Sequence, residues 1–155
     1  MDYDKGEIQM MKGIFHASIT VSNLERSIAF YRDILGCKLL YTRESSGEGL
    51  SEGVGVENAY LKIAMLRVGD GGFLELIEYV TPKCVPKQLR PCDIGSMHVA
   101  FHVEDIVEMA RRLNNHGYHF NAPPRHITEG PMKGWVWAYF KDPDGAQLEL
   151  VETRD

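Results

Sequence analysis

Hydrophobic and polar residues alternate in several short segments of the chain, whereas two longer stretches show helical spacing. The alternation at residues 14–21 predicts a strand, because successive side chains of a strand point to opposite faces. Apolar residues between positions 24 and 35 recur every three or four residues, which predicts a helix that Ser22 caps and Gly36 ends. Further strands are predicted at residues 38–43, 60–66 and 73–80.

The same order of elements is predicted a second time in the other half of the chain. His16 and its strand match His98 and its strand, and an Asp-Gly turn precedes both the strand of Glu75 and the strand of Glu149. The second half has a predicted helix at 106–115 and predicted strands at 97–103, 118–121, 135–141 and 147–152. Each half is therefore an α+β unit of one strand, one helix and three strands.

The duplication defines the organisation that we expect for the 155 residues. Residues 1–12 form an N-terminal extension, and residues 13–155 form one domain. Its two modules, 13–80 and 96–153, are joined by a proline-containing connector at 81–95. Two loops are expected at equivalent places, at 44–58 and 122–134, and the first is rich in Gly and Glu and is expected to be mobile.

The composition narrows the class of protein. With 44% hydrophobic and 25% charged residues the chain has the make-up of one globular domain, without a membrane-spanning run or a signal peptide. The net charge is −5 and the basic residues are scattered, so we expect no nucleic-acid or membrane partner. Cys37, Cys84 and Cys92 have no metal-binding or paired spacing, so we interpret them as free thiols of a cytoplasmic protein.

Four polar residues occupy positions where polar side chains are unexpected. Glu75 and Glu149 lie in the middle of equivalent strands, each between two leucines, where an unpaired carboxylate is costly. His16 and His98 lie at the starts of the two equivalent first strands, so a pseudo-two-fold axis can bring all four side chains to one point. Two imidazoles and two carboxylates suit one divalent metal ion (Ni, Co, Zn, Mn or Fe(II)), with two octahedral positions left for water or substrate.

His102 is the main alternative ligand, because it shares a strand face with His98. A lone strand histidine is usually a core or edge residue, and the counterpart of His102 in the first half is Thr20. The internal symmetry therefore favours His98 as the ligand and leaves His102 as a candidate pocket residue.

The segments around these residues resemble the vicinal oxygen chelate superfamily, which includes glyoxalase I, methylmalonyl-CoA epimerase, extradiol dioxygenases and fosfomycin and bleomycin resistance proteins. The resemblance covers nearly the whole chain after Lys12 and is carried by residues 16–36, 74–76, 98–105 and 142–149. It implies two paired βαβββ modules that form a curved mixed sheet around a metal site, with His16, Glu75, His98 and Glu149 as the ligands. Four protein ligands favour the glyoxalase I and epimerase branch over the three-ligand dioxygenases and fosfomycin transferases and over the bleomycin-binding members, which lack the ligands.

The resemblance implies a metal-dependent isomerase or epimerase that removes an α-proton from a small carbonyl substrate through a metal-stabilised enediolate, with Glu149 as the base. The alternatives are a glutathione-dependent lactoylglutathione lyase, a ring-cleaving dioxygenase and a non-catalytic resistance protein. Thr20 and Tyr79 stand where glyoxalase I binds glutathione through an arginine and an asparagine, so we expect no efficient turnover of glutathione adducts. A homodimer is expected, and the modules can pair within one chain or across it. Candidate substrate contacts are Lys62, Tyr79, His102, His126 and Lys133.

Overall fold

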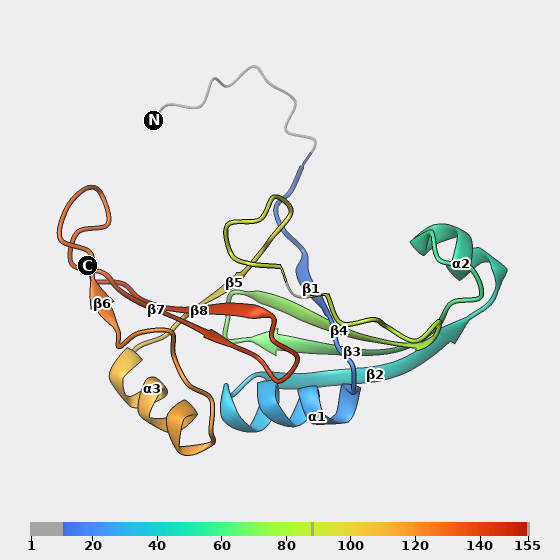
Figure 1. The fold of residues 1–155 in the computed structure, drawn as a ribbon, viewed down its shortest axis with the longest axis horizontal. Helices are drawn as coiled ribbons and strands as arrows, with labels where there is room; N and C mark the ends of the chain where they lie inside the picture. Colours follow the sequence, from blue (N-terminus) through green and yellow to red (C-terminus); the bar gives the residue numbers. More distant parts are fainter. Residues whose placement is uncertain (1–10, 88, 155) are drawn as a thin grey trace.

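The computed structural model describes residues 11–87 and 89–154 and contains two βαβββ modules (Figure 1). The first comprises β1 (His16–Thr20), α1 (Leu24–Ala29), η1 (Phe30–Ile34), β2 (Lys38–Ser46), α2 (Glu48–Val54), β3 (Tyr60–Val68) and β4 (Gly72–Thr81). The second comprises β5 (Val99–His102), α3 (Ile106–Asn115), β6 (Arg125–His126), β7 (Val136–Lys141) and β8 (Gln147–Glu152). The predicted α+β fold with a duplicated unit is confirmed.

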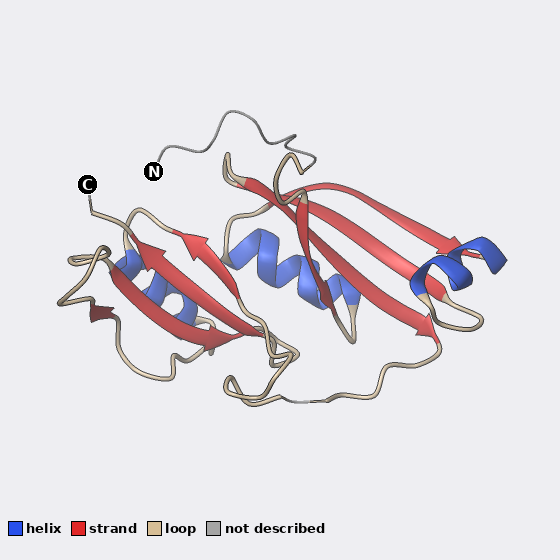
Figure 2. Ribbon diagram, turned by 90° about the horizontal axis from the view of Figure 1, so that it is seen from above, coloured by secondary structure: helices blue, strands red, loops and turns tan. Residues whose placement is uncertain are grey.

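Each module has its own four-stranded mixed sheet, in the orders β1-β4-β3-β2 and β5-β8-β7-β6 (Figure 2). In both sheets the first strand runs parallel to the last strand of the module, and the other neighbours are antiparallel. β1 and β5 are therefore edge strands, and β2 and β6 form the opposite edges.

Both module helices begin in the same way. Asn23 and Asp105 are the N-caps, and their side chains accept hydrogen bonds from the third residue beyond them. A glutamate near the end of the last strand adds a second acceptor: Glu78 binds the backbone N–H of Leu24 at 2.7 Å, and Glu152 does the same for the first residue of α3 at 2.9 Å. These two carboxylates lie on the helix side of their sheets, where they neutralise the positive end of the helix dipole.

Three local predictions differ from the structure. Ser22 does not cap α1, because its hydroxyl and its N–H both bind Asp144 of the second module. The segment 44–58, predicted to be a loop, contains the end of β2 and α2. The strand predicted at 118–121 is reduced to a single bridge between Phe120 and Phe140, and the edge strand β6 follows it.

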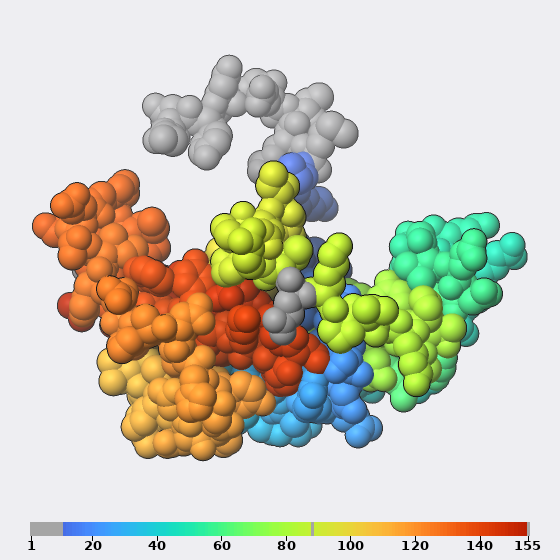
Figure 3. All heavy atoms as spheres, viewed as in Figure 1, coloured from blue at the N-terminus to red at the C-terminus, as the bar shows by residue number. Residues whose placement is uncertain are grey.

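One hydrophobic core is shared by the two modules. The helices α1 and α3 lie on the same side of the two sheets (Figure 1), and the first module packs against the second through aromatic side chains. The ring centroids of Phe30 and Tyr118 are 4.5 Å apart, and those of Tyr31 and Phe101 are 6.4 Å apart. In the space-filling view the second module lies directly against the first (Figure 3). The modules are thus joined through their helix sides.

Polar contacts fix the β7–β8 turn of the second module onto α1. The buried Asp142 accepts a hydrogen bond from the hydroxyl of Tyr31 at 3.0 Å, and burial raises the pKa of this carboxyl. Asp144 accepts from the N–H of Ser22 at 2.9 Å and from its hydroxyl at 2.6 Å, and forms an ion pair with Arg26. Partial burial would raise the pKa of Asp144, but these contacts outweigh it and lower the pKa.

Residues 1–10, most of the predicted N-terminal extension, lie outside the described residues. Within the described residues, none of the helices has the length and apolar character needed to cross a membrane.

Candidate functional site

The first module brings His16 and Glu75 together on one face of its sheet. The parallel register of β1 and β4 places Ser18 opposite Glu75, so His16 lies diagonally across from the carboxylate. His16 Nε2 is 3.4 Å from Glu75 Oε2. The glutamate side chain is 14% exposed and the histidine 34%, so the pair is open to solvent mainly at the imidazole.

The second module repeats this arrangement. His98 immediately precedes β5, and Ala100 lies opposite Glu149 of β8. His98 Nε2 is 3.1 Å from Glu149 Oε2. The internal symmetry seen in the sequence is therefore present in the site: each module holds one imidazole and one carboxylate in the same relative place.

The two His–Glu pairs do not meet within one chain. Leu74, Leu76 and their counterparts in β8 point into the shared core, so Glu75 and Glu149 lie on the sheet faces turned away from it. Among residues 11–87 and 89–154 no group of three or more His, Cys, Asp or Glu side chains is close enough to hold a metal ion. Convergence of the four ligands within a single chain, one of the two kinds of pairing that the sequence left open, is thus not found among these residues, because the two pairs lie on the open faces of two separate sheets.

The second pair has polar and aromatic neighbours. Tyr139 of β7 lies opposite Glu149, its hydroxyl is 3.4 Å from His98 Nε2, and its ring meets that of His98 edge to face. Partial burial and the charge of Glu149 raise the pKa of Tyr139. Further along the same face, His102 Nε2 lies 2.9 Å from the hydroxyl of Thr153, which repeats the diagonal contact of His98 with Glu149. His102 was recognised from the sequence as a candidate pocket residue, whereas Tyr139 was not, because only the register of β7 with β8 places it on the face of Glu149.

The first pair has apolar neighbours instead. Met65 of β3 occupies the place opposite Glu75 that Tyr139 occupies in the second module. Next to it on the same face lie Ile63 and Leu61, both buried. Tyr79 shares this face of β4, so it lies on the same surface as Glu75, as the prediction of a substrate contact requires.

Three other predicted substrate contacts are not placed with the pairs. Lys62 lies opposite Glu78 and therefore on the face of β3 that is turned away from Glu75. His126 pairs with Val136, on the α3 side of the second sheet, and lines a hollow with residues of that helix. Lys133 is exposed in a turn, and no contact in the described residues joins it to His98 or Glu149. The alternation along the strands thus places Lys62 and His126 on the faces turned away from the His–Glu pairs.

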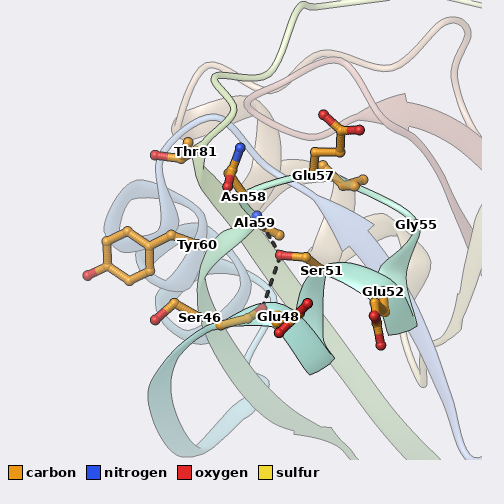
Figure 4. Close-up of a pocket in the computed structure, with 12 residues that line it drawn as sticks. Ser46, Glu48, Ser51, Glu52, Gly55, Glu57, Asn58, Ala59, Tyr60 and Thr81 are labelled. Carbon is orange, nitrogen blue, oxygen red and sulfur yellow. Dashed lines mark hydrogen bonds between the residues drawn. The ribbon is translucent and has the colours of Figure 1, made fainter.

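A surface hollow of about 790 Å³ lies between α2 and the strand ends of the first module, away from both pairs (Figure 4). It is formed between α2 and the ends of β3 and β4. Ser51 of α2 accepts a hydrogen bond from Ala59 N and donates to Gly47 O, which fixes the helix over the strand ends. Several glutamates line this hollow, and none of the predicted ligands does.

The donor chemistry of the two pairs fits a divalent metal ion. Each pair contributes an imidazole nitrogen and a carboxylate oxygen that already lie side by side. Borderline metals such as Zn²⁺, Ni²⁺ and Fe²⁺ accept this mixture of ligands. One pair alone supplies only two protein ligands, so a complete centre requires both kinds of pair.

Comparison with known proteins places these residues in a family context. Residues 13–150 match the model of the Glyoxalase/Bleomycin resistance protein/Dioxygenase superfamily. A 2-epi-5-epi-valiolone epimerase from an Actinomyces species is 35% identical over 89% of this chain and 78% of its own. A lactoylglutathione lyase from Salmonella typhimurium is 31% identical over 92% of this chain and 93% of its own. These similar proteins are enzymes.

The fold is also similar to that of solved structures. A glyoxalase family protein from Bacillus cereus superposes with a TM-score of 0.79, is 25% identical, and matches 99% of this chain and all of its own. The similarity therefore extends over both modules and the connector.

Proposed function

Because the chain belongs to the Glyoxalase/Bleomycin resistance protein/Dioxygenase superfamily, we propose that it is a divalent-metal-dependent isomerase or epimerase. It would remove the proton next to a carbonyl of a small oxygenated substrate. The observation that carries this proposal is the pair of equivalent His–Glu contacts, His16 with Glu75 and His98 with Glu149, each on an open sheet face.

In this proposal, two chains together form the complete site. The first pair of one chain would face the second pair of a partner, because the two pairs of one chain do not come together among the described residues. Exposed apolar side chains support a covering partner: Phe15 directly precedes His16, and Met97 directly precedes His98. The edge strands β1 and β5 beside these residues also have free backbone groups for pairing.

A metal ion held by the four ligands would polarise the substrate carbonyl and so make the adjacent C–H bond more acidic. Glu149 is the residue that we assign as base. Its carboxylate lies opposite Tyr139, whose hydroxyl can donate a hydrogen bond to it and so orient it toward the substrate, whereas Glu75 lies opposite the thioether of Met65. A general base must be held within reach of the proton that it removes, and only Glu149 has such an orienting neighbour in the opposite strand.

Polar residues further along the same faces would orient the substrate. His102 and Thr153 form a hydrogen-bonded pair beyond Glu149, and Tyr79 lies beyond Glu75. These groups donate and accept hydrogen bonds, and they suit hydroxyl groups of a substrate. Together with the epimerase relative, this favours an epimerase over a lactoylglutathione lyase.

Elemental analysis of the purified protein tests the proposal. We expect one divalent metal ion per chain in the wild type, and its loss in His16→Ala and in His98→Ala. His116→Ala is the matched control, because this exposed histidine at the end of α3 binds only the carbonyl of Arg112.

Two activity assays accompany the metal analysis. The metal-loaded protein should epimerise 2-epi-5-epi-valiolone or exchange an α-proton of it with deuterium oxide, and should turn over the hemithioacetal of methylglyoxal and glutathione poorly. Proton exchange that persists at full rate after complete metal removal would refute the metal-dependent mechanism. Efficient turnover of the hemithioacetal would identify the protein as a lactoylglutathione lyase instead.

A further inference from the structure

Two arginines occupy equivalent positions on the faces that carry the His–Glu pairs. In the first sheet Arg43 of β2 lies opposite Ile63, which lies opposite Ile77. In the second sheet Arg125 of β6 lies opposite Trp137, which lies opposite Val151. Ile77 and Val151 each follow the ligand glutamate by two residues, so both arginines share the face of that glutamate.

The position relative to the carboxylate is the same in both modules. Each arginine is two strands away from Glu75 or Glu149 and two residues further along, which corresponds to roughly 12 Å between Cα atoms. An extended arginine covers more than half of that distance. A molecule of the size of a small sugar, bound at the carboxylate, would therefore meet the guanidinium with its far end.

Arg43 and Arg125 are also the arginines that the fold leaves uncompensated. The chain has nine arginines. Five form ion pairs, Arg112 donates to a backbone carbonyl, and Arg67 lies over the ring of Phe73. Among residues 11–87 and 89–154, no side-chain ion pair, side-chain hydrogen bond or cation–π contact involves Arg43 or Arg125.

The neighbours of the two arginines do not neutralise them. Glu44, next to Arg43 in sequence, lies on the opposite face of β2, where it binds the hydroxyl of Tyr60. His126, next to Arg125, lies on the α3 side of its sheet. Both guanidinium groups are exposed and are therefore free to bind an anion.

We propose that Arg43 and Arg125 bind an oxyanion group, a carboxylate or a phosphate, at the end of the substrate remote from the reacting carbonyl. The inference rests on the proposed function, because it places this group relative to the His–Glu pairs. Two such arginines, one at the outer edge of each half of the assembled site, would make hydroxyketones that carry an anionic group bind more tightly than neutral ones. A guanidinium binds both kinds of oxyanion through two parallel hydrogen bonds.

Three small ketones that share a hydroxymethyl group test the proposal: dihydroxyacetone phosphate, 5-hydroxy-4-oxopentanoate, whose carboxylate is separated from the carbonyl by two methylene groups, and neutral dihydroxyacetone. Their binding to the metal-loaded protein is measured by calorimetry. We expect at least one of the two anions to bind about ten-fold or more tightly than dihydroxyacetone. The stronger anion identifies the group as phosphate or carboxylate.

Variants assign the preference to the arginines. Arg43→Gln and Arg125→Gln should each remove most of the preference for the anion, and the double variant should remove it completely while dihydroxyacetone binds as before. Lys62→Gln is the control, because it removes one positive charge from the opposite face of β3. Equal binding of all three ketones, or a double variant that loses no more than Lys62→Gln, would overturn the inference.

Deuterium exchange in the same samples separates this inference from the proposed function. Metal-dependent α-proton exchange of dihydroxyacetone without any anion preference would leave the proposed function intact and refute the role of the arginines. An arginine-dependent preference without proton exchange would support the anion site and count against the isomerase.

Discussion

The two modules share one fold and one His–Glu geometry but differ in what surrounds the pair. At the place opposite the ligand glutamate the first module has Met65 and the second has Tyr139. Two residues before these positions, on the same strand faces, the first module has Ile63 and the second module has Trp137. The first half-site is thus mainly apolar, and the second is rich in groups that donate or accept hydrogen bonds.

The positions that are the same in both modules are those that the fold and the proposed metal require. The ligand positions are repeated, and so are the strand-end carboxylates Glu78 and Glu152 that bind the helix N-termini. The neighbouring positions on these faces lie outside the core that the two modules share, so they can differ between the modules without changing that core. In the proposed mechanism the duplicated unit would supply two equal ligand pairs, while proton transfer and substrate orientation would fall mainly to the second module.

The largest expected effect tests the unequal roles of the two carboxylates. Glu149→Gln keeps an oxygen ligand but removes the proton acceptor, so activity should fall by on the order of 10² or more. Glu75→Gln should bind metal more weakly but keep partial activity, because one negative charge is lost while an oxygen donor remains. Metal content and α-proton exchange are measured for both variants. Equal losses that excess metal restores in both would mean that neither carboxylate is the base.

A second experiment asks whether the two unequal pairs come from different chains. His16→Ala and His98→Ala should each be inactive alone. Co-expressed in equal amounts they should recover about a quarter of wild-type activity, because half of the dimers would be mixed and each mixed dimer would have one intact site. Activity is measured per chain on the purified mixture, with the mixing ratio determined by mass spectrometry.

Pairing of the modules within one chain predicts a different result for that mixture. Every chain would then carry a defect in its own site, and the mixture would remain inactive. A monomer in light scattering at micromolar concentration would likewise exclude the site between two chains.

The smallest expected effect concerns the Asp-Gly turns, which are equivalent in sequence but not in contacts. Asp144 binds Ser22 and Arg26, whereas Asp70 in the first module is exposed. Asp144→Ala should lower the free energy of unfolding by about 2 kcal/mol at pH 7, and Asp70→Ala should change it little. Denaturant unfolding measures both.

The same pair of variants has a defined pH dependence. The contacts lower the pKa of Asp144 in the folded protein, so its contribution is present above the unfolded pKa of about 3.9 and is lost as the pH falls through the folded value. The difference between wild type and Asp144→Ala should therefore shrink in acid. A difference that is unchanged by acid would show that the charge of Asp144 contributes little to its contacts with Ser22 and Arg26.

Much of the fold and the ligand pairing follows from local sequence patterns. Strand alternation and the repeat were enough to predict that His16 is equivalent to His98 and Glu75 to Glu149, because side-chain direction in a strand is fixed by parity. Lys62 was misplaced for a definite reason. Both faces of β3 are apolar, so the sequence pattern does not reveal which face shares a surface with Glu75, and only the register with β4 decides it.

Other features depend on contacts between distant segments. The position of His126 depends on a two-residue strand that forms only by pairing with β7, and Tyr139 gains significance only from its distance to His98. Ser22 is a residue type that often caps helices, yet its hydroxyl binds Asp144 of the other module, and Asn23 is the N-cap instead. Such competition is decided by tertiary packing and leaves no local signal.

The sequence by itself determined the duplicated βαβββ order, the two equivalent His–Glu pairs and the donor chemistry that suits a divalent metal. These properties follow from periodicity and residue type, which act over a few residues. Only the tertiary structure decided that the pairs lie on separate faces, because that depends on how the aromatic side chains of η1, Phe30 and Tyr31, pack against the second module. That packing buries the leucine faces of both sheets in one core and turns the two ligand pairs outward.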